Sequence, residues 1–576
     1  MTGIRGVVGL ADSTARLESS VRIGNRQVAA CARLDNREEI LGLLGLSGAG
    51  RGAHSDSALV QRAFDAWGEA CVSRLLGDWC LAAWDEEARR LFVARDQHGI
   101  SALYVAATPS QFAFSSDRQW VLAQTGVRRE LDEQWLAHTL AAWPRHDGRR
   151  TCYIGLQRLP PAHALTLQHG NVRTWRYWRL EEAPDVRLRS RAEYAEALGE
   201  HLDRAVASRL RPGEPIALAL SAGLDSTAVA ALAARQLHAR GERMLALTAI
   251  PAYPHPDPGG NRFGNEFALA ARVAAAADID HVGVDARDVT PLDGLAFMLE
   301  AHGEPTPAVS NYYWVRALHE TARDHGARVV LTGQYGNMTA SWPGLPTVAS
   351  VFALGLGGWW PRAAREAAAV MRYRSMTVSR CIRQALSAPS PIHPRFADRM
   401  GLAAAARAWA RESMIGSVRQ RVRAERQWLI APGADITGAR RAELAAAIGV
   451  ESRDPMRDIR LMEFVHGMPP DILRLPVPRA PIRDAMRGLL PDAVRLQTRR
   501  GLQAPDLIAR VRAVAPLVEE QLAALERHPL ALEYLDLPRM RQVFDRASRV
   551  EDERTRRAAA TVLLRGLGVG IFLLRH

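Results

Sequence analysis

The 576-residue sequence contains no lysine, so its 75 Lys and Arg positions are all arginines, against 62 Asp and Glu. This absence excludes a Schiff base, a lysine general base and the phosphate-binding lysine of a Walker A loop. Any clamp for phosphate must use arginine, which stays charged and can donate two hydrogen bonds to one oxyanion. A GC-rich genome would also favour arginine over lysine. This explanation of the bias is compatible with arginines that bind phosphate.

Other scarce features exclude further classes of protein. The five cysteines form no CxxC pair, which fits thiols in a reducing cytoplasm and argues against a structural zinc site. No window holds about 18 uninterrupted apolar residues, and the start of the chain lacks the features of a signal peptide. The net charge is +13, but the arginines are interspersed with acids. We therefore expect a cytoplasmic protein with no membrane span and no nucleic-acid partner.

The chain divides into two segments with different patterns. Residues 1 to about 180 contain short apolar runs between turn residues, which predicts a β-rich domain, and a polar stretch near 180–192 is the predicted linker. Strands and helices then alternate, as is typical of a doubly wound parallel sheet, before an arginine- and alanine-rich helical extension after about 345. The predicted strands are 216–220, 244–250, 281–285 and 327–333, and the predicted helices are 194–210, 227–239, 265–277, about 291–301 and 311–325.

The stretch LALSAGLDSTAVAAL (218–232) runs from a strand through a small-residue turn into a helix. Free backbone N–H groups and the positive end of the helix dipole would make this turn an anion site. Gly223 lets the main chain approach a ligand, and the hydroxyls of Ser221 and Ser226 add donors. Asp225 fits an anion site if it holds a cation, so Mg2+ accompanying a phosphate is expected. The alternative is a plain helix start capped by Asp225 or Ser226.

The turn resembles the SGGxDS pyrophosphate loop of N-type ATP pyrophosphatases. Further segments are similar to class II asparagine synthetases in the same order, which include MTGIRGVVG, RLDNREEIL, LLGDWCLAAWD, LFVARDQHGISALYVA, LQRLPPAHAL and GVESRDPMRDIRLMEF. The resemblance implies a glutaminase-like αββα domain of the Ntn type at 1–185. It also implies an ATP-binding synthetase domain with a parallel sheet at 193–576. ATP and Mg2+ are the implied ligands.

Two features of that family are missing from the N-terminal domain. The family's nucleophilic cysteine after the initiator methionine is replaced by Thr2, and the stretch that grips glutamine is absent. An N-terminal threonine can itself act as a nucleophile. We nevertheless interpret the domain as structural, with no hydrolysis of glutamine, so that a substrate amine replaces ammonia.

A further departure lies in LTGQYGNMTASW (331–342). Asn337 occupies the place of a magnesium-binding aspartate, and Gln334 that of a glutamate or tyrosine. An amide oxygen can bind Mg2+ but brings no charge, so Asn337 is the second candidate metal ligand after Asp225. Together with HGEPTPAVSNYYW, this segment is most similar to the cyclases that close lasso peptides. Tyr312, Tyr313 and Trp314 could line a peptide cleft or pack in the core.

The resemblance assigns roles to individual residues elsewhere. Arg499 stands where relatives have a lysine that stabilises charge in the second half-reaction. Glu451 is the first candidate for the general base and Glu304 the second, with a structural ion pair as the alternative for each. The remaining assignments to the ATP and pyrophosphate site are Leu220, Thr248 and Gly333, with a plain buried threonine as the alternative for Thr248.

These features predict an ATP-dependent ligase that adenylates an Asp or Glu side chain of a ribosomal precursor peptide. The peptide's own N-terminal amine would then displace AMP and close a macrolactam. The alternatives are a β-lactam synthetase or an asparagine synthetase acting on a small amino acid, and a non-enzymatic scaffold that presents a precursor peptide. A lasso system also implies a leader-peptide protease and a leader-binding protein as partners.

Overall fold

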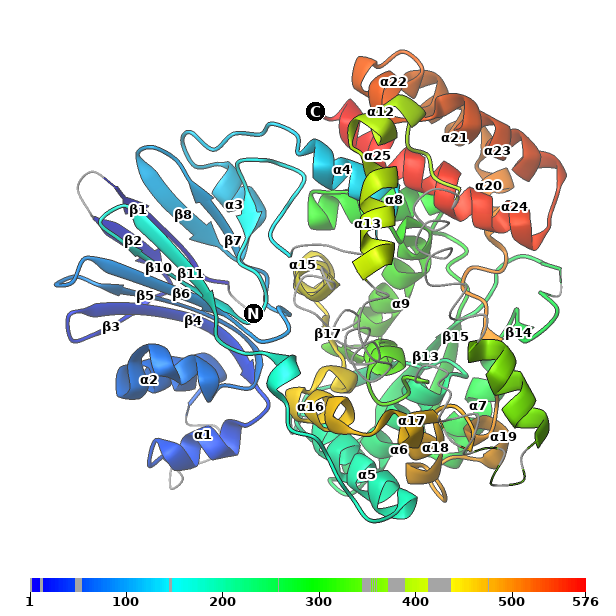
Figure 1. The fold of residues 1–576 in the computed structure, drawn as a ribbon, viewed down its shortest axis with the longest axis horizontal. Coiled ribbons are helices and arrows are strands. Elements are labelled where there is room, and N and C mark those ends of the chain that lie inside the picture. The colour runs from blue at the N-terminus through cyan, green and yellow to red at the C-terminus, as the bar shows by residue number, and fades with distance from the viewer. Residues whose placement is uncertain are drawn as a thin grey trace.

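The computed structural model describes residues 3–10, 14–46, 54–143, 148–256, 258–343, 354, 356, 358, 360–370, 389–412, 437–474 and 476–576. Two antiparallel sheets form the N-terminal part of the chain, drawn in blue and cyan in Figure 1. The first has the order β2 (Ala15–Glu18), β1 (Arg5–Gly9), β8 (Gln111–Ser115), β7 (Tyr104–Ala107) and β9 (Gln157–Arg158). The second has the order β11 (Asn171–Arg176), β10 (His163–Gln168), β6 (Arg90–Arg95), β5 (Gly77–Asp85), β4 (Arg26–Leu34) and β3 (Val21–Ile23).

The two sheets pack face to face and are covered by helices on their outer faces. One core, which includes Leu91, Leu103 and Phe114, lies between the sheets. The helices α1 (Arg37–Leu43) and α2 (Asp56–Trp67) share a second core with the six-stranded sheet, and α3 (Arg118–Leu122) contacts β7 and β8 of the other sheet. Because both faces of β5 are covered, its sequence GDWCLAAWD is buried almost throughout rather than alternating. The predicted αββα arrangement is confirmed.

The second domain contains a five-stranded sheet in which every pairing is parallel. Its order is β15 (Asp280–Val284), β13 (Met244–Ala249), β12 (Ile216–Ala219), β16 (Val329–Leu331) and β17 (Glu451–Arg453). The four predicted strands are present within a few residues of their expected ends. The fifth strand, β17, was missed because three residues give no detectable pattern.

Helices cover both faces of this sheet, because successive residues of each strand point to opposite sides. Leu218 and Leu331 pack into one core, whereas Ala217 and Val330 pack into the other. The first face is covered by α5 (Arg191–Ala207), α6 (Leu224–His238), α7 (Phe267–Ala276), α16 (Ile459–Gly467) and α18 (Ala480–Ala485). The second face is covered by α8 (Pro291–His302), α9 (Tyr312–Asp324) and α15 (Thr437–Ile448), together with C-terminal helices.

The connection order creates a crevice at the carboxyl ends of the strands. From β12 the chain adds β13 and β15 on one side, then crosses back to place β16 on the other side of β12. Neighbouring connections therefore leave in opposite directions beside β12, which is the topological switch point where open α/β sheets bind ligands. The turn that follows β12 lies at this position.

The C-terminal region is a helical layer, drawn in orange and red in Figure 1. It comprises α20 (Leu507–Ala513), α21 (Ala515–Leu525), α22 (Pro529–Tyr534), α23 (Leu537–Arg549), α24 (Glu553–Ala558), a π-helical turn η6 (Ala559–Leu564) and α25 (Arg565–Leu574). By length and composition, the continuous helix Glu553–Leu574 would be able to cross a membrane, but 67% of its most apolar window is buried inside the protein. Leu563 and Leu567 are fully buried in the core, so it packs as a core helix.

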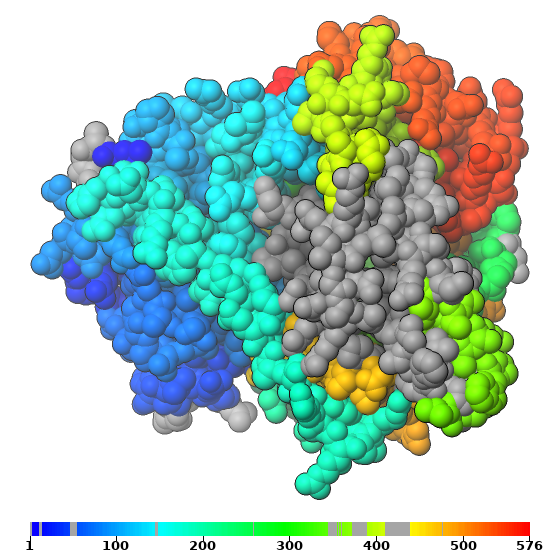
Figure 2. Space-filling view, in the orientation of Figure 1, coloured from blue at the N-terminus to red at the C-terminus, as the bar shows by residue number. Residues whose placement is uncertain are grey.

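The segment between β11 and α5 follows the surface of the second domain, and Figure 2 shows it in cyan across one face. Val186 donates its N–H to the carbonyl oxygen of Gly467 at 3.0 Å. The Tyr194 hydroxyl accepts from the N–H of Leu188 and donates to the carbonyl of Val186. The segment is therefore tied down at several points. The domain bounds 1–185 and 193–576 stay predictions.

A buried charge cluster joins the two domains. Glu304 is 1% exposed and forms ion pairs with Arg118 at 2.8 Å and with Arg158, both from the N-terminal domain. Arg440 of the second domain lies 3.7 Å away. Burial alone would raise the pKa of Glu304, but the three guanidinium groups outweigh it and lower the pKa to about 2. The interpretation of Glu304 as a general base is wrong, because a buried carboxylate held by arginines has no access to substrate.

We expect Glu304→Gln to lower the free energy of unfolding by about 3–5 kcal/mol, since it leaves buried guanidinium groups without a counter-charge. Urea denaturation would measure this. Glu182→Gln is the matched control, because Glu182 is 71% exposed and 3.8 Å from its partner, so its effect should stay below about 1 kcal/mol. A near-zero effect of Glu304→Gln would contradict the role of the cluster.

The same carboxylate predicts a dependence on pH. Its pKa falls from 4.5 to about 2 on folding, so its contribution is complete above pH 4.5 and disappears as the pH falls toward 2. The difference in unfolding midpoint between wild type and Glu304→Gln should therefore shrink across that interval. A difference independent of pH would contradict this assignment.

Candidate active site

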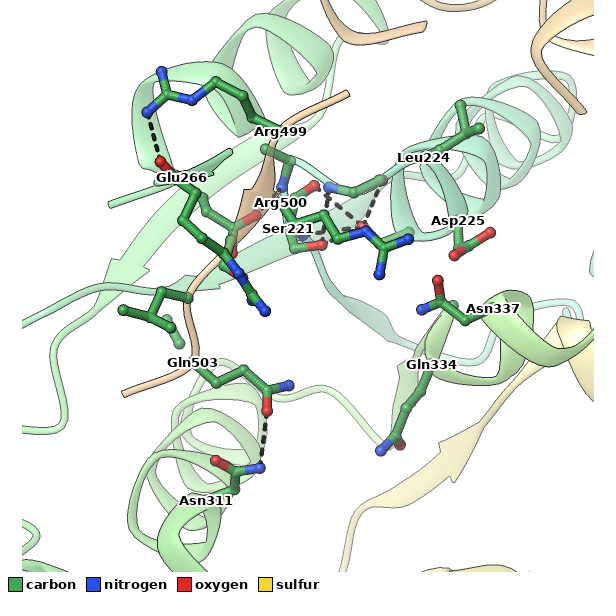
Figure 3. A pocket seen from close by; sticks show the side chains of 18 of the residues that line it. Ser221, Leu224, Asp225, Glu266, Asn311, Gln334, Asn337, Arg499, Arg500 and Gln503 are labelled. Carbon is green, nitrogen blue, oxygen red and sulfur yellow. Dashed lines mark hydrogen bonds between the residues drawn. The ribbon is translucent and has the colours of Figure 1, made fainter. Parts of the chain in front are cut away.

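A cavity of about 1880 Å³ opens at the carboxyl ends of β12, β13 and β16. Figure 3 shows part of it, with the turn after β12 on one side and Asn311 and Gln503 on the other. Of the residues assigned from the sequence, the lining includes Leu220, Ser221, Gly223, Asp225, Ser226, Thr248, Gly333, Asn337 and Arg499. The cavity therefore brings together residues that are up to 279 positions apart in the chain.

The turn is held in shape by its own side chains. The hydroxyls of Ser221 and Ser226 lie 2.8 Å apart, and each also hydrogen-bonds to backbone groups of the turn. Gly223 is the N-cap of α6, and no side chain caps this helix. The capping alternative is therefore wrong. The serines stiffen the turn, and the uncapped helix start faces the cavity with its positive dipole end.

Asp225 lies in the first turn of α6 and is 6% exposed. Its Oδ1 atom is buried without a hydrogen-bond partner among the described residues. Burial raises the pKa of this carboxyl to about 6; the Ser341 hydroxyl, Arg479 and Arg500 oppose the shift, and Asp454 adds to it. A buried carboxylate oxygen without a partner is costly, and a cation would satisfy it.

Two glycines allow the backbone to approach Asp225 closely. A Cβ atom on Gly336 would lie 2.3 Å from Cγ of Asp225, and a Cβ atom on Gly333 would lie 2.6 Å from the backbone N of Ser226. Any side chain at these positions would displace the carboxylate or the helix start. The structure thus gives Gly333 a steric reason to be glycine.

Two arginines lie close to the Asp225 carboxylate. Arg479 donates to Oδ1 of Asn337 at 2.6 Å, and it adopts a positive φ of 68°, a conformation that is strained for a side chain of this size. Arg500 extends toward Asp225 in Figure 3. Arg499 points away from the turn: it donates to the carbonyl oxygen of Arg262 at 2.5 Å and lies 4.5 Å from the ring centre of Phe263.

The direction of these side chains corrects the assignment of Arg499. Arg499 directly precedes the short strand β18 (Arg500–Gly501). Successive residues of an extended chain point to opposite sides, so Arg499 and Arg500 point in opposite directions. Resemblance to the related sequences gave Arg499 the role of the charge-stabilising cation. In the structure it is the Arg500 side chain that extends toward the turn (Figure 3). Sequence reasoning missed Arg500 and Arg479 because the whole chain is rich in arginine.

Glu266 is a second carboxylate at the turn. Its Oε2 accepts a hydrogen bond from the N–H of Ala222 at 2.9 Å, and burial raises its pKa. Gly501 makes room for it, since a Cβ atom there would lie 1.8 Å from Oε1. The Glu266 carboxylate therefore already accepts the hydrogen bond of the Ala222 N–H, which an anionic ligand could otherwise use.

Comparison with known proteins agrees with this geometry. The family model described as asparagine synthase matches residues 197–571, and the glutamine amidotransferase domain matches residues 34–178. The chain belongs to the asparagine synthase family. The matched region contains the turn, both glycines beside Asp225 and the two arginines that face it.

Individual relatives cover only part of this asparagine synthase family member. It is 29% identical over 191 residues to asparagine synthetase (glutamine-hydrolyzing) 3 of Bacillus subtilis, covering 33% of this chain and 31% of that protein. It is 27% identical to amidase chry2 of Gibberella zeae, covering 49% and 42%. The chain thus matches less than half the length of these curated relatives. The match to a solved glutamine phosphoribosylpyrophosphate amidotransferase of B. subtilis covers 57% of this chain and 81% of that chain, at 13% identity and a TM-score of 0.22.

The site suits a magnesium ion that arrives with a phosphate ligand. Asp225 supplies an unpartnered carboxylate oxygen. Across the described part of the chain, no group of three or more His, Cys, Asp and Glu side chains could form a complete metal site. Mg2+ is commonly held by one or two carboxylates plus phosphate oxygens and water, which fits this arrangement. Asn337 could join only after its Oδ1 atom releases Arg479. ATP and Mg2+ stay predictions.

Glu451 does not line the cavity. It pairs with Arg453 at 2.8 Å and lies 3.9 Å from Arg33 of the N-terminal domain. Burial would raise its pKa, but these guanidinium groups lower it. Its interpretation as the general base is therefore wrong, and the ion-pair alternative holds.

Thr248 lines the cavity, but its hydroxyl is already used. It donates to the carbonyl of Leu220 at 2.7 Å and lies 2.8 Å from Nε2 of His281. Its predicted contact with adenine or ribose therefore cannot use the hydroxyl as a free donor. The Leu220 carbonyl is likewise engaged, as the acceptor of this hydrogen bond.

Some of the remaining residues singled out from the sequence line the cavity, and others do not. Tyr313 and Trp314 line the cavity, while Tyr312 contacts the ring of His302 instead. Thr2 lies outside the described residues. Gln334 lines the cavity and accepts a hydrogen bond from Arg441 at 2.8 Å.

We expect Arg500→Met to weaken Mg·ATP binding by about tenfold or more, because it removes a cation that faces the turn. Arg499→Met is the matched control, since it removes an equal charge one residue away and should change the affinity less than about twofold. Isothermal titration calorimetry would measure both. Equal losses in the two variants, or a larger loss in Arg499→Met, would restore the original assignment.

The raised pKa of Asp225 predicts that Mg2+-dependent ATP binding weakens in acid. The carboxyl must lose its proton to attract the cation, so the affinity should fall roughly tenfold per pH unit below about 6 and level off above it. Titrations between pH 5 and 8 would show this. Asp225→Asn should bind weakly with no such dependence, and a wild-type profile that stays flat would contradict the assignment.

Proposed function

We propose that the chain is an ATP-dependent carbon–nitrogen ligase that closes a macrolactam in a ribosomal peptide, as lasso peptide cyclases do. The Asp or Glu side-chain carboxylate of the peptide attacks the α-phosphorus of ATP, and pyrophosphate leaves. The peptide's N-terminal amine then attacks the acyl-adenylate carbon. An amide bond forms, AMP departs and the amine loses its proton.

The size and position of the cavity carry this proposal. Its volume of about 1880 Å³ exceeds the roughly 300–1,000 Å³ of sites for small ligands. It extends from the phosphate-binding turn to Asn311 and Gln503 on the opposite wall. A nucleotide together with a folded peptide needs more space than a nucleotide together with a single amino acid, and a cavity of this volume suits the larger pair.

The residues of the turn would support the first half-reaction. The uncapped helix start and the cations of Arg479 and Arg500 stabilise the charge of the departing pyrophosphate. Asp225 would hold the Mg2+ that neutralises the phosphate oxygens. Because both reacting groups belong to one peptide held in one cavity, positioning supplies a large part of the rate in the second half-reaction.

The proton released by the amine requires an acceptor, and we assign this role to Glu266. Among the described acids that line the cavity, Glu366, Asp506 and Glu553 are ion-paired with arginines. Glu266 has no arginine partner in the part of the chain that the structure describes, and its raised pKa brings it closer to the pH at which a base accepts protons efficiently. It thereby replaces Glu304 and Glu451 as the candidate base.

The proposal also concerns the N-terminal domain and the partners. An intramolecular amine makes ammonia unnecessary, which agrees with the missing glutamine-gripping stretch. The domain would then act as a structural partner of the synthetase domain through the Glu304 cluster. The precursor core peptide is the substrate, and a leader-peptide protease and a leader-binding protein are the expected partners.

ATP–pyrophosphate exchange tests the proposal. Purified protein with Mg2+ would be given aspartate, a small β-amino acid or leaderless core peptides from neighbouring genes. We expect exchange only with a peptide, a product lighter by one water, and a loss of at least about 100-fold in Asp225→Asn. Arg554→Gln, an exposed arginine outside the cavity, is the matched control.

The other outcomes would each contradict the peptide cyclase. Exchange with aspartate alone would favour an asparagine synthetase, and exchange with the β-amino acid alone would favour a β-lactam synthetase. No exchange and no ATP binding would favour the non-enzymatic scaffold.

A further inference from the structure

Arg565 is a buried cation with no counter-ion among the described residues. It is 7% exposed, yet no carboxylate of the described residues lies within ion-pair distance of it. Its Nε donates to the carbonyl of Pro307 at 3.1 Å and its Nη1 to that of Leu140 at 3.3 Å. Within the described part of the chain, its Nη2 has no hydrogen-bond partner. Burial lowers its pKa to about 10.

The buried arginines of the protein fall into two groups. Among the described residues, Arg95 and Arg483 resemble Arg565, because they donate only to backbone carbonyls. Arg118 and Arg158 share Glu304, and Arg510 pairs with Asp506 at 3.0 Å. Each of these guanidinium groups has a carboxylate because an uncompensated buried charge is strongly unfavourable. Arg565 and Arg483 both line the large cavity, where a ligand could supply the missing negative charge.

Arg565 belongs to a helix face that forms one wall of this cavity. Arg556, Arg557, Ala560 and Thr561 line the cavity from the same helix. The π-helical turn η6 (Ala559–Leu564) lies within this face, and π turns occur frequently at functional sites. The small side chains of Ala560 and Thr561 leave room between the arginines.

The wall is positively charged as a whole. Glu553 pairs with Arg556 at 2.8 Å and with Arg557 at 2.6 Å, so one carboxylate serves both. Together with Arg565 the wall keeps a surplus of two positive charges. Arg556 also donates to the backbone carbonyl of Gln503, whose side chain accepts a hydrogen bond from Asn311 on the side of the cavity opposite the turn in Figure 3. The cavity thus has one cationic region at the turn and a second on this helix.

We propose that the wall formed by Arg556, Arg557, Thr561 and Arg565 binds a carboxylate of the substrate other than the one that is activated. This inference rests on the proposed function in one respect, namely that the substrate enters this cavity. It defines the substrate class more narrowly: an acid that carries at least two carboxylates, one for adenylation and one for anchoring. In a peptide, the second would be the C-terminal carboxylate or another acidic side chain.

Matched peptides would test this subsite. A leaderless core peptide would be compared with its C-terminal amide and with a form in which each acidic side chain outside the activated position is an amide. In ATP–pyrophosphate exchange, we expect one of these changes to raise KM by about 30-fold or more with little effect on kcat. The change that does so identifies which carboxylate is bound. Equal KM values for all three peptides would overturn the proposal.

The variants separate the subsite from general effects on the protein. Arg565→Met should raise KM for the free acid by a similar factor while leaving KM for the affected amide unchanged. Arg554→Met is the matched control, because Arg554 lies on the same helix, is exposed and does not line the cavity. Thr561→Asp tests the same wall should Arg565→Met fail to fold, since an added carboxylate should repel the acid and spare the amide. Retained discrimination in a folded Arg565→Met or Thr561→Asp would overturn the proposal.

A binding measurement keeps this test independent of adenylation. The free-acid peptide and its amides would be titrated by calorimetry in the presence of Mg2+ and inorganic pyrophosphate, without ATP. If exchange fails with every peptide, the proposed function fails, yet tighter binding of the free acid that is lost in Arg565→Met would still support the subsite. Binding that ignores both the amidation and the variant would reject the subsite even where exchange occurs.

Discussion

The burial of one carboxylate at the start of α6 is the constraint on which the candidate site depends. Asp225 sits where a helix dipole and free amides favour negative charge, but where the surrounding protein excludes water. Gly333 and Gly336 are needed because any Cβ atom there would collide with the carboxylate or its backbone. The serine hydroxyls hold the turn in shape by accepting hydrogen bonds from its own amides. The result is a buried carboxylate oxygen that has no geometric hydrogen-bond partner among the described residues and that a cation could satisfy.

A chain without lysine must use arginine wherever a permanent positive charge is needed. In the structure, these arginines differ in whether a carboxylate lies beside them. Arg118, Arg158 and Arg453 are buried against carboxylates and join the two domains or fasten β17 to its surroundings. Arg500 and Arg565 line the cavity without an ion pair to any described carboxylate. Because all of these residues are arginines, the sequence alone does not distinguish them. The position of their partners distinguishes structural arginines from those that are available to a ligand.

The same distinction applies to the acids. Glu304 and Glu451 stand in conspicuous motifs, yet both are held by arginines at the boundary between the domains. Their ion pairs connect the N-terminal domain to the second domain. Glu266, by contrast, lies in an undistinguished stretch and reaches the turn through the amide of Ala222. Chemical availability therefore follows from burial and pairing rather than from the motif.

The αββα arrangement was implied by the family resemblance. The sequence by itself determined the β-rich character of the N-terminal segment, the alternation of strands and helices from 191 to 331, and the place of the turn after β12. These follow from hydrophobic periodicity and from short-range chemistry, which neighbouring residues carry. Tertiary structure alone decided that β17 completes the sheet, that Arg500 rather than Arg499 faces Asp225, and that the hydroxyl of Thr248 is engaged. Each of these depends on strand register or on a partner far away in the chain, such as Arg262 for Arg499. The absence of a carboxylate partner for Arg565 among the described residues is of the same kind, because it depends on which distant segments pack against the helix.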